Sequence, residues 1–284
     1  MGSGCMAAMN DGAIFLKPAG WAMCVYAHTC AKADFSIPVP SSQRFAMKPT
    51  RDTDVVETPP ASMPNPGKHF LKFVDAASFP CVGAKSALAR GSIETHEFGI
   101  LGAHENDQPL LDRLCRFVGM VESESCDEDL VHSLVAIFSG PDDMTERCFE
   151  TLLWAQLWQA HKLDVKAGSR PAPDVSSDTT DSTFSLSMAG HPFFIIGLHA
   201  RASRLARRFR YPVLVFNSHR QFEKLRMDGR YEKMQAAIRV RDIELQGSIN
   251  PNLADFGDAS EARQYSGRRV ASDWKCPYDF RKPQ

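Results

Sequence analysis

The sequence lacks the features that define several large classes of protein. No apolar run approaches the roughly 20 residues that a membrane helix needs, so we expect no membrane span. The eight cysteines stand singly, without a CxxC pair or a zinc-ligand spacing, and no GxGxxG turn is present to hold a dinucleotide. Neither sign of charge dominates, since 33 basic residues face 34 acidic ones. The sequence therefore predicts reduced thiols in a cytoplasmic protein, with neither a disulfide framework nor a zinc module.

What the chain does have is typical of a globular protein. Of its 284 residues, 43% are hydrophobic and 24% are charged, enough to bury a core without covalent staples. The exception is the segment from Ile37 to Gly67, whose Pro, Ser, Thr and Asp content cannot bury enough apolar surface to order itself. We therefore predict that residues 1–66 are a disordered extension, or follow from a start codon assigned too far upstream. Residues 67–284 are predicted to form one domain.

Hydrophobic patterning predicts a central sheet within this domain. Apolar runs indicate buried strands at residues 130–138, 192–199 and 211–217. Helical signals cover residues 82–89, the segment after a capping box of Asp143 and Glu146, and residues 220–227 and 229–245. A Pro/Ser/Asp loop at 166–183 is a candidate lid, and the last forty residues are irregular. The fold class is therefore α/β (or α+β), with a mostly buried sheet flanked by helices and a long irregular C-terminal segment.

A cluster of five arginines follows the second apolar run. Arg201, Arg204, Arg207, Arg208 and Arg210 lie within ten residues, and spacings of three and four predict that the first, second and fourth share a helical face. Between residues 191 and 241, twelve basic side chains face only three acidic ones. Such a cluster favours recognition of carboxylate or phosphate. A solvated surface turn is an equally simple explanation.

Three histidines and one cysteine could take part in chemistry. His199 ends one predicted strand and His219 follows another, and ligands of open α/β sheets bind where strands end. His161 lies one helical turn beyond Trp158 and two beyond Trp154. Cys81 precedes a predicted helix, whose N-terminus favours the thiolate form. The alternative for each is a buried side chain that merely packs.

Several motifs occur in order between Lys68 and Tyr278. They include FPCVGAKSALARG, LLWAQLWQAHKLD, HPFFIIGLHARASRLARRF, QGSINPNLADFG, SEARQYSGRRV and WKCPY. Together they resemble the YqcI/YcgG family, and within it most closely the branch of heme-dependent N-hydroxylases that act in guanitoxin biosynthesis. Relatives in this family hydroxylate the guanidine of arginine or oxidise the side-chain amine of lysine.

The resemblance implies a heme-dependent N-hydroxylase that uses O2, an external electron donor and a small guanidino or amino substrate. Heme b would need an apolar slot, for which Trp154 and Trp158 are candidates, and cations for its propionates. The candidate cations are Arg204, Arg207 and Arg208. The candidate carboxylates for the substrate cation are Glu223, Asp242, Asp255 and Glu261.

His161 is the first choice for the axial ligand of the iron. It projects from a predicted helix between two indoles, and Asp164, one turn on, could orient its ring. The alternatives are His199, His219 and Cys81, of which the last would supply a thiolate.

The rival function is a nucleic-acid or anion-binding module that uses the segment Arg201–Arg210. Against it, these residues adjoin apolar strands instead of a recognition helix, and the sequence pI is about 6.7. We therefore expect neither a nucleic-acid partner nor a membrane partner.

Overall fold

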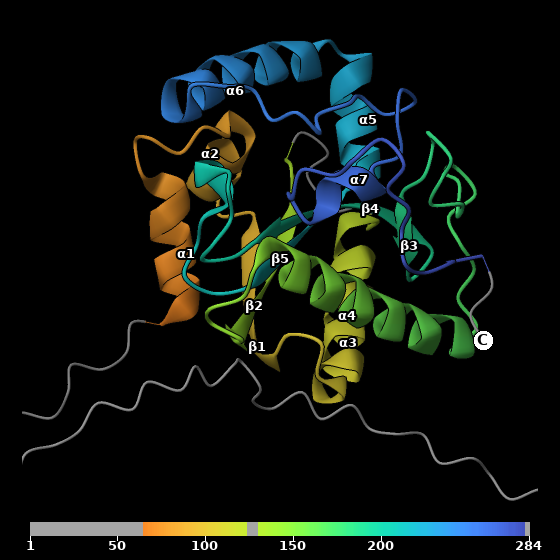
Figure 1. Ribbon diagram of the computed structural model, residues 1–284. Helices are drawn as coiled ribbons and strands as arrows, with labels where there is room; N and C mark the ends of the chain where they lie inside the picture. Colours follow the sequence, from red (N-terminus) through yellow and green to blue (C-terminus); the bar gives the residue numbers. More distant parts are fainter. Residues whose placement is uncertain (1–64, 124–129, 282–284) are drawn as a thin grey trace, which may run out of the picture. The chain divides into compact units, whose positions relative to one another are not determined.

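A five-stranded mixed sheet organises the computed structural model, which describes residues 65–123 and 130–281 (Figure 1). The strands are β1 (Ile93–Ile100), β2 (Ser133–Gly140), β3 (Leu186–Met188), β4 (His191–Leu198) and β5 (Val213–Ser218). Their order across the sheet is β1-β2-β5-β4-β3. Only β1 and β2 run parallel, and the other three neighbouring pairs are antiparallel. The predicted fold class is confirmed, with a sheet of mixed direction.

Helices cover both faces of this sheet. They are α1 (Pro66–Asp75), α2 (Val82–Ala89), α3 (Asp107–Val121), α4 (Glu146–Lys166), α5 (His219–Met227), α6 (Arg230–Gln246) and the short α7 (Ala262–Tyr265). Short 3-10 turns occupy His104–Asn106 and Leu205–Arg207. Among the residues described, no helix is both long enough and apolar enough to cross a bilayer.

Alternation along the strands divides the buried residues into two sets. Phe193 and Ile195 of β4 point to one face, where α3 and α4 complete a core that includes Leu153 and Trp154. Val135 of β2 belongs to the other set, which packs against α1. We call the first the packed face and the second the α1/α2 face. Figure 1 shows α3 and α4 on one side of the sheet, away from α1 and α2.

Most helix boundaries follow the local chemistry that predicted them. The N-cap of α2 is Cys81, and Gly91, with φ of 70°, follows its C-terminus. Helix α6 ends at Gly247, with φ of 75°, as predicted. The prediction of a capping box formed by Asp143 and Glu146 is wrong. The N-cap of α4 is Thr145, whose Oγ1 accepts the Cys148 N–H at 3.2 Å.

Two further expectations need correction. The arginine segment is not a continuous helix, since only the 3-10 turn Leu205–Arg207 forms there. The second correction concerns strand direction. Strands β4 and β5 are antiparallel, with Leu198 opposite Val213 and Phe193 opposite Ser218. His199 and His219 therefore follow opposite ends of the sheet and do not share one crevice.

Some elements carry no prediction from the sequence, namely α1, β1, α3, β3 and α7. The extension predicted for residues 1–66 lies outside the described residues, apart from Asn65 and Pro66, which begin α1. The four cysteines within the described segments are free thiols.

Candidate functional site

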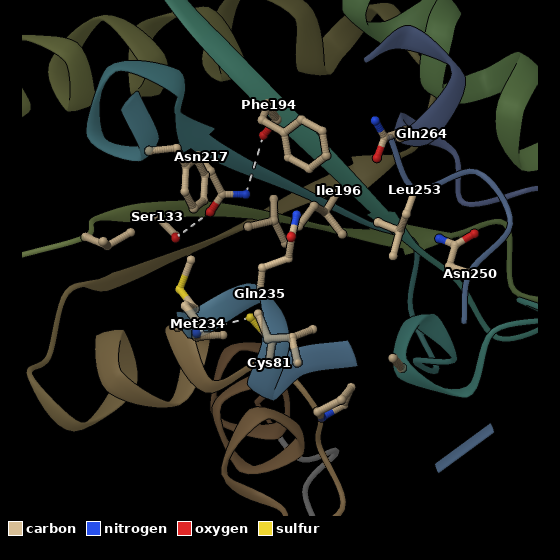
Figure 2. Close-up of a pocket in the computed structure, with 18 of the residues that line it drawn as sticks. Cys81, Ser133, Phe194, Ile196, Asn217, Met234, Gln235, Asn250, Leu253 and Gln264 are labelled. Atoms are coloured by element: carbon tan, nitrogen blue, oxygen red, sulfur yellow. Dashed lines mark hydrogen bonds between the residues drawn. The ribbon is translucent and has the colours of Figure 1, made fainter. Parts of the chain in front are cut away.

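A cavity of about 310 Å³ lies on the α1/α2 face of the sheet. Its floor is formed by side chains of β2, β4 and β5, and it is enclosed by α2, α6 and the irregular segment around Asn250. Figure 2 shows Phe194 and Ile196 of β4 across the cavity from Cys81 and Met234. The volume falls at the lower end of the range for small-molecule sites.

The walls are largely apolar and include two sulfur atoms. Phe194, Ile196 and Val215 line the floor, and Met234 of α6 lies above Gly83 of α2. A Cβ atom at Gly83 would approach the Met234 sulfur to 2.8 Å and the Cys81 sulfur to 3.8 Å. A glycine at this position therefore lets the Met234 sulfur lie close to α2, at the same end of the cavity as the Cys81 sulfur.

Cys81 lines the cavity as the N-cap of α2. Its sulfur accepts the Ala84 N–H at 3.4 Å, so the helix N-terminus faces the thiol. Burial raises the pKa of Cys81, and the backbone N–H groups of Ala84 and Gly83 act in the opposite direction. The thiol is protonated in this state, in a place where a positive charge would favour the thiolate.

The arginine cluster divides into inward and outward side chains. Arg201 is exposed and contacts Asp143, Arg208 donates to the Ala202 carbonyl, and Arg210 lies over the ring of Tyr211. Arg204 and Arg207 line the cavity. The cluster is thus not one continuous cationic face.

The two inward arginines differ in their partners. Arg204 is buried and forms an ion pair with Asp242, and its guanidinium also donates to the Ser248 carbonyl at 2.7 Å. Arg207 forms no ion pair with any residue that the structure describes. Its Nη1 donates instead to the carbonyl oxygens of Gln264 at 2.9 Å and Tyr265 at 3.1 Å.

Arg207 is removed from water and closely packed by its neighbours. Removal from water lowers the pKa of its guanidinium to about 10. Gly267 has φ of 78°, and a Cβ there would come within 2.6 Å of Arg207 Cδ. The site therefore keeps a cation on the cavity wall without a neutralising carboxylate, which favours an anionic group of a ligand.

The four candidate carboxylates also differ. Glu223 does not line the cavity and pairs with Arg226, and Asp242 is paired with Arg204. Asp255 lines the cavity and accepts the Gln235 amide at 2.6 Å. Glu261 also lines it and is only 4% exposed, yet its Oε2 has no hydrogen-bond partner among the described residues.

His219 connects two of these carboxylates. The ring is buried and packs against Phe256, with centroids 4.3 Å apart. Its Nδ1 lies 3.4 Å from Glu261 Oε1, and its Nε2 lies 3.4 Å from Glu223 Oε1. His219 therefore marks the polar end of the cavity, near the N-terminus of α7.

His161 and the two tryptophans lie away from this cavity. Trp154 is fully buried on the packed face and stacks on Tyr265 at 5.5 Å, and Trp158 stacks on Tyr278 at 5.3 Å. His161 donates from Nε2 to the Phe280 carbonyl at 3.2 Å, and burial lowers its pKa. Asp164 does not orient this ring, because His161 Nδ1 has no hydrogen-bond partner among the described residues, and the Asp164 carboxylate accepts the Ala189 N–H.

His199 is also outside the cavity lining. It is 1% exposed and stacks on Phe149, with ring centroids 4.5 Å apart. Neither ring nitrogen has a partner among the described residues, and burial lowers its pKa to about 4. His199 is therefore neutral at physiological pH.

Some lining residues were missed by the sequence analysis. Asn217 puts a polar group into an apolar strand, and its Oδ1 accepts the Ser133 hydroxyl at 2.7 Å on the cavity floor. The signal was an asparagine at the end of an otherwise apolar run. Met234 and Gln235 of α6 carried no comparable signal, because this helix has polar residues all around.

Comparison with known proteins gives one match. A model of the YqcI/YcgG family covers residues 70–279. The chain belongs to the YqcI/YcgG family. No curated protein and no solved structure matches it. The matched segment of this family member contains every cavity-lining residue named above.

Proposed function

We propose that this protein is a heme-dependent N-monooxygenase that hydroxylates a guanidine or amine nitrogen of a small amino-acid-like molecule. The observation that carries the proposal is an apolar cavity with a thiol at a helix N-terminus and a cation, Arg207, that lacks a carboxylate partner. The sequence resemblance to the guanitoxin-biosynthesis branch supports the same chemistry. A role in specialised metabolite biosynthesis follows from that resemblance.

The residues present fit the requirements of heme b. No group of three or more His, Cys, Asp or Glu arranged for a metal ion occurs within residues 65–123 and 130–281, but a heme iron needs only one protein ligand. Two of the four candidate ligands, Cys81 and His219, line the cavity. Cys81 lies at the apolar end with Met234, whereas His219 lies near two carboxylates. We therefore transfer the proposed ligand role from His161 to Cys81.

The rest of the cavity supplies complementary surroundings. Phe194, Ile196 and Val215 present an apolar wall to a porphyrin, and Arg207 would neutralise a propionate or a substrate carboxylate. Arg204 is bound to Asp242 and holds α6 in place.

The chemistry that heme b would supply when bound is the reductive activation of O2, which puts one oxygen atom on the substrate nitrogen, oxidising it by two electrons, and the other in water. Two electrons and two protons come from an external donor. The chain's own residues would hold the reactants. Cys81 would bind the heme iron at the apolar end of the cavity, Arg207 would bind an anionic group, and the apolar floor would exclude water.

The test is a hemin titration of the full chain followed by an activity assay. We expect a Soret band that saturates at one heme per chain. With O2, a reductant and arginine, lysine or their analogues, we expect a product heavier by one oxygen atom. A protein that is colourless once unbound hemin has been removed would refute the proposal.

A further inference from the structure

Glu261 occupies an unusual position for a carboxylate. It is 4% exposed, it precedes α7, and it lines the cavity. A buried ionisable group is ordinarily paired or hydrogen-bonded, because a buried acceptor without a donor costs about 1–3 kcal/mol, and more when charged. Glu261 Oε2 has no such donor among the residues that the structure describes. The fold thus keeps one acceptor unsatisfied at the cavity.

The other acidic groups nearby do not share this property. Asp242 is paired with Arg204, Asp255 accepts a hydrogen bond from Gln235, and Glu223 is paired with Arg226. These carboxylates therefore have partners without a ligand. Among the four, only Glu261 has a buried oxygen without a hydrogen-bond partner in the described residues.

The second oxygen of Glu261 lies beside His219. Glu261 Oε1 lies 3.4 Å from Nδ1 of His219, and the opposite ring nitrogen faces Glu223. The imidazole also packs against Phe256, which fixes its plane. Since one oxygen faces the imidazole, the other is free to accept from a ligand.

We propose that Glu261 Oε2, positioned by His219, binds the cationic nitrogen of the small molecule that this cavity takes. The ligand group is an ammonium or a guanidinium, because a charge-assisted N–H donor best offsets the burial of a carboxylate. This inference rests on the proposed function only in assigning the substrate to the same cavity. It names the residue that selects a charged substrate over a neutral one.

Arg207 lies at the other end of the same short helix. It donates to the carbonyl oxygens of Gln264 and Tyr265, the last two residues of α7, whereas Glu261 precedes the first. The two opposite charges are thus separated by about one helical turn of backbone. Both residues line the cavity, which therefore offers one group of each charge to a zwitterionic ligand.

The experiment compares matched probes that differ in charge and carry no carboxylate, so that Arg207 does not contribute. The first pair is methylguanidinium and methylurea, and the second is butylammonium and butanol. Dissociation constants are measured by ligand-observed NMR on the full chain, before and after hemin loading. We expect the wild-type chain to bind at least one cation about tenfold or more tightly than its neutral partner. The pair that shows the preference identifies guanidinium or ammonium as the ligand group.

Two variants locate the effect. Glu261→Gln keeps the shape but removes the charge, and we expect the preference to disappear. Glu223→Gln is the matched control, because Glu223 also faces His219 but does not line the cavity, and it should retain the preference.

Equal binding of cation and neutral probe by the wild-type chain would overturn the inference, even if Glu261→Gln did not fold. Loss of the preference in Glu223→Gln, or its persistence in Glu261→Gln, would also overturn it. Binding of hemin without any charge preference would contradict this inference alone. A charge preference in a chain that does not bind hemin would contradict only the heme proposal.

Discussion

Phe193 and Phe194 are neighbours in β4, yet their side chains enter different environments. Phe193 is fully buried on the packed face, between α3 and the sheet, whereas Phe194 lines the cavity on the α1/α2 face. The packed face is closed by large aromatic and aliphatic side chains. On the α1/α2 face, among the described residues, the Arg207 guanidinium has no ion pair and one Glu261 carboxylate oxygen has no hydrogen-bond donor. The same strands thus carry stability on one face and a candidate site on the other.

The first prediction compares these two phenylalanines. Phe193→Ala should lower the free energy of unfolding by about 3–5 kcal/mol, because it opens a hole in a filled core. Phe194→Ala should cost about 1–2 kcal/mol, since its side chain already borders empty space. Urea unfolding of both variants measures the difference. Equal costs would contradict the division between a packed and an open face.

The second prediction compares the two inward arginines. Arg204→Met leaves the buried carboxylate of Asp242 without its partner and should cost about 3–5 kcal/mol of stability. Arg207→Met removes a cation that has no ion pair and loses only hydrogen bonds to carbonyls, so about 1 kcal/mol is expected. The same Arg207 variant should bind hemin or a substrate carboxylate more weakly. If Arg207→Met proved the more destabilising, its proposed role as a free cation would be wrong.

The third prediction concerns the pH dependence of stability and the contribution that buried His199 makes to it. The pKa of His199 is about 4 in the folded state, below its ordinary value near 6.5, so the unfolded state binds the proton first as pH falls. Its contribution to stability is complete above pH 6.5 and is lost toward pH 4, by about 2 kcal/mol at pH 5. Urea unfolding at pH 7.5 and pH 5 should show a smaller decrease in His199→Asn than in wild type.

The fourth prediction compares two glycines. A Cβ at Gly197 would lie 2.6 Å from Phe149 Cε1 and 2.9 Å from the Tyr265 carbonyl oxygen, so Gly197→Ala should cost about 1–3 kcal/mol. Gly119 in α3 has open space around it, and Gly119→Ala should stabilise the protein by up to about 1 kcal/mol. Thermal unfolding compares the two. A neutral Gly197→Ala would show that α4 and α7 do not pack closely on β4.

Sequence reasoning located the elements whose signals are local. Apolar runs indicated β2, β4 and β5, and Gly247 marked the end of α6. Strand β1 was missed because its sequence, IETHEFGI, mixes charged and apolar residues, as an edge strand in contact with solvent permits. Helix α3 did have apolar residues at helical spacing, including Leu110, Leu114 and Phe117, so its pattern could have predicted it.

The candidate site was predictable only in part. Cys81, Arg207 and Glu261 were all named from the sequence, and the structure brings them to one cavity. Their partners were not predictable, because Arg204 and Asp242 are 38 residues apart and only the fold shows that they pair. The direction of β5 relative to β4 was also not predictable, and it decides that His199 and His219 lie at opposite ends of the sheet.

The most direct test of the account is the absorption spectrum of the reduced, carbon monoxide-bound protein after hemin loading, compared for wild type, Cys81→Ser and His161→Gln. Cys81 lines the cavity on the α1/α2 face, whereas His161 is enclosed by Trp158 and Phe280. The account predicts the long-wavelength Soret band of a thiolate-ligated heme in wild type and in His161→Gln, and its loss in Cys81→Ser. A thiolate band that persists in Cys81→Ser, or heme that is lost only from His161→Gln, would contradict the assignment of the cofactor site to the cavity.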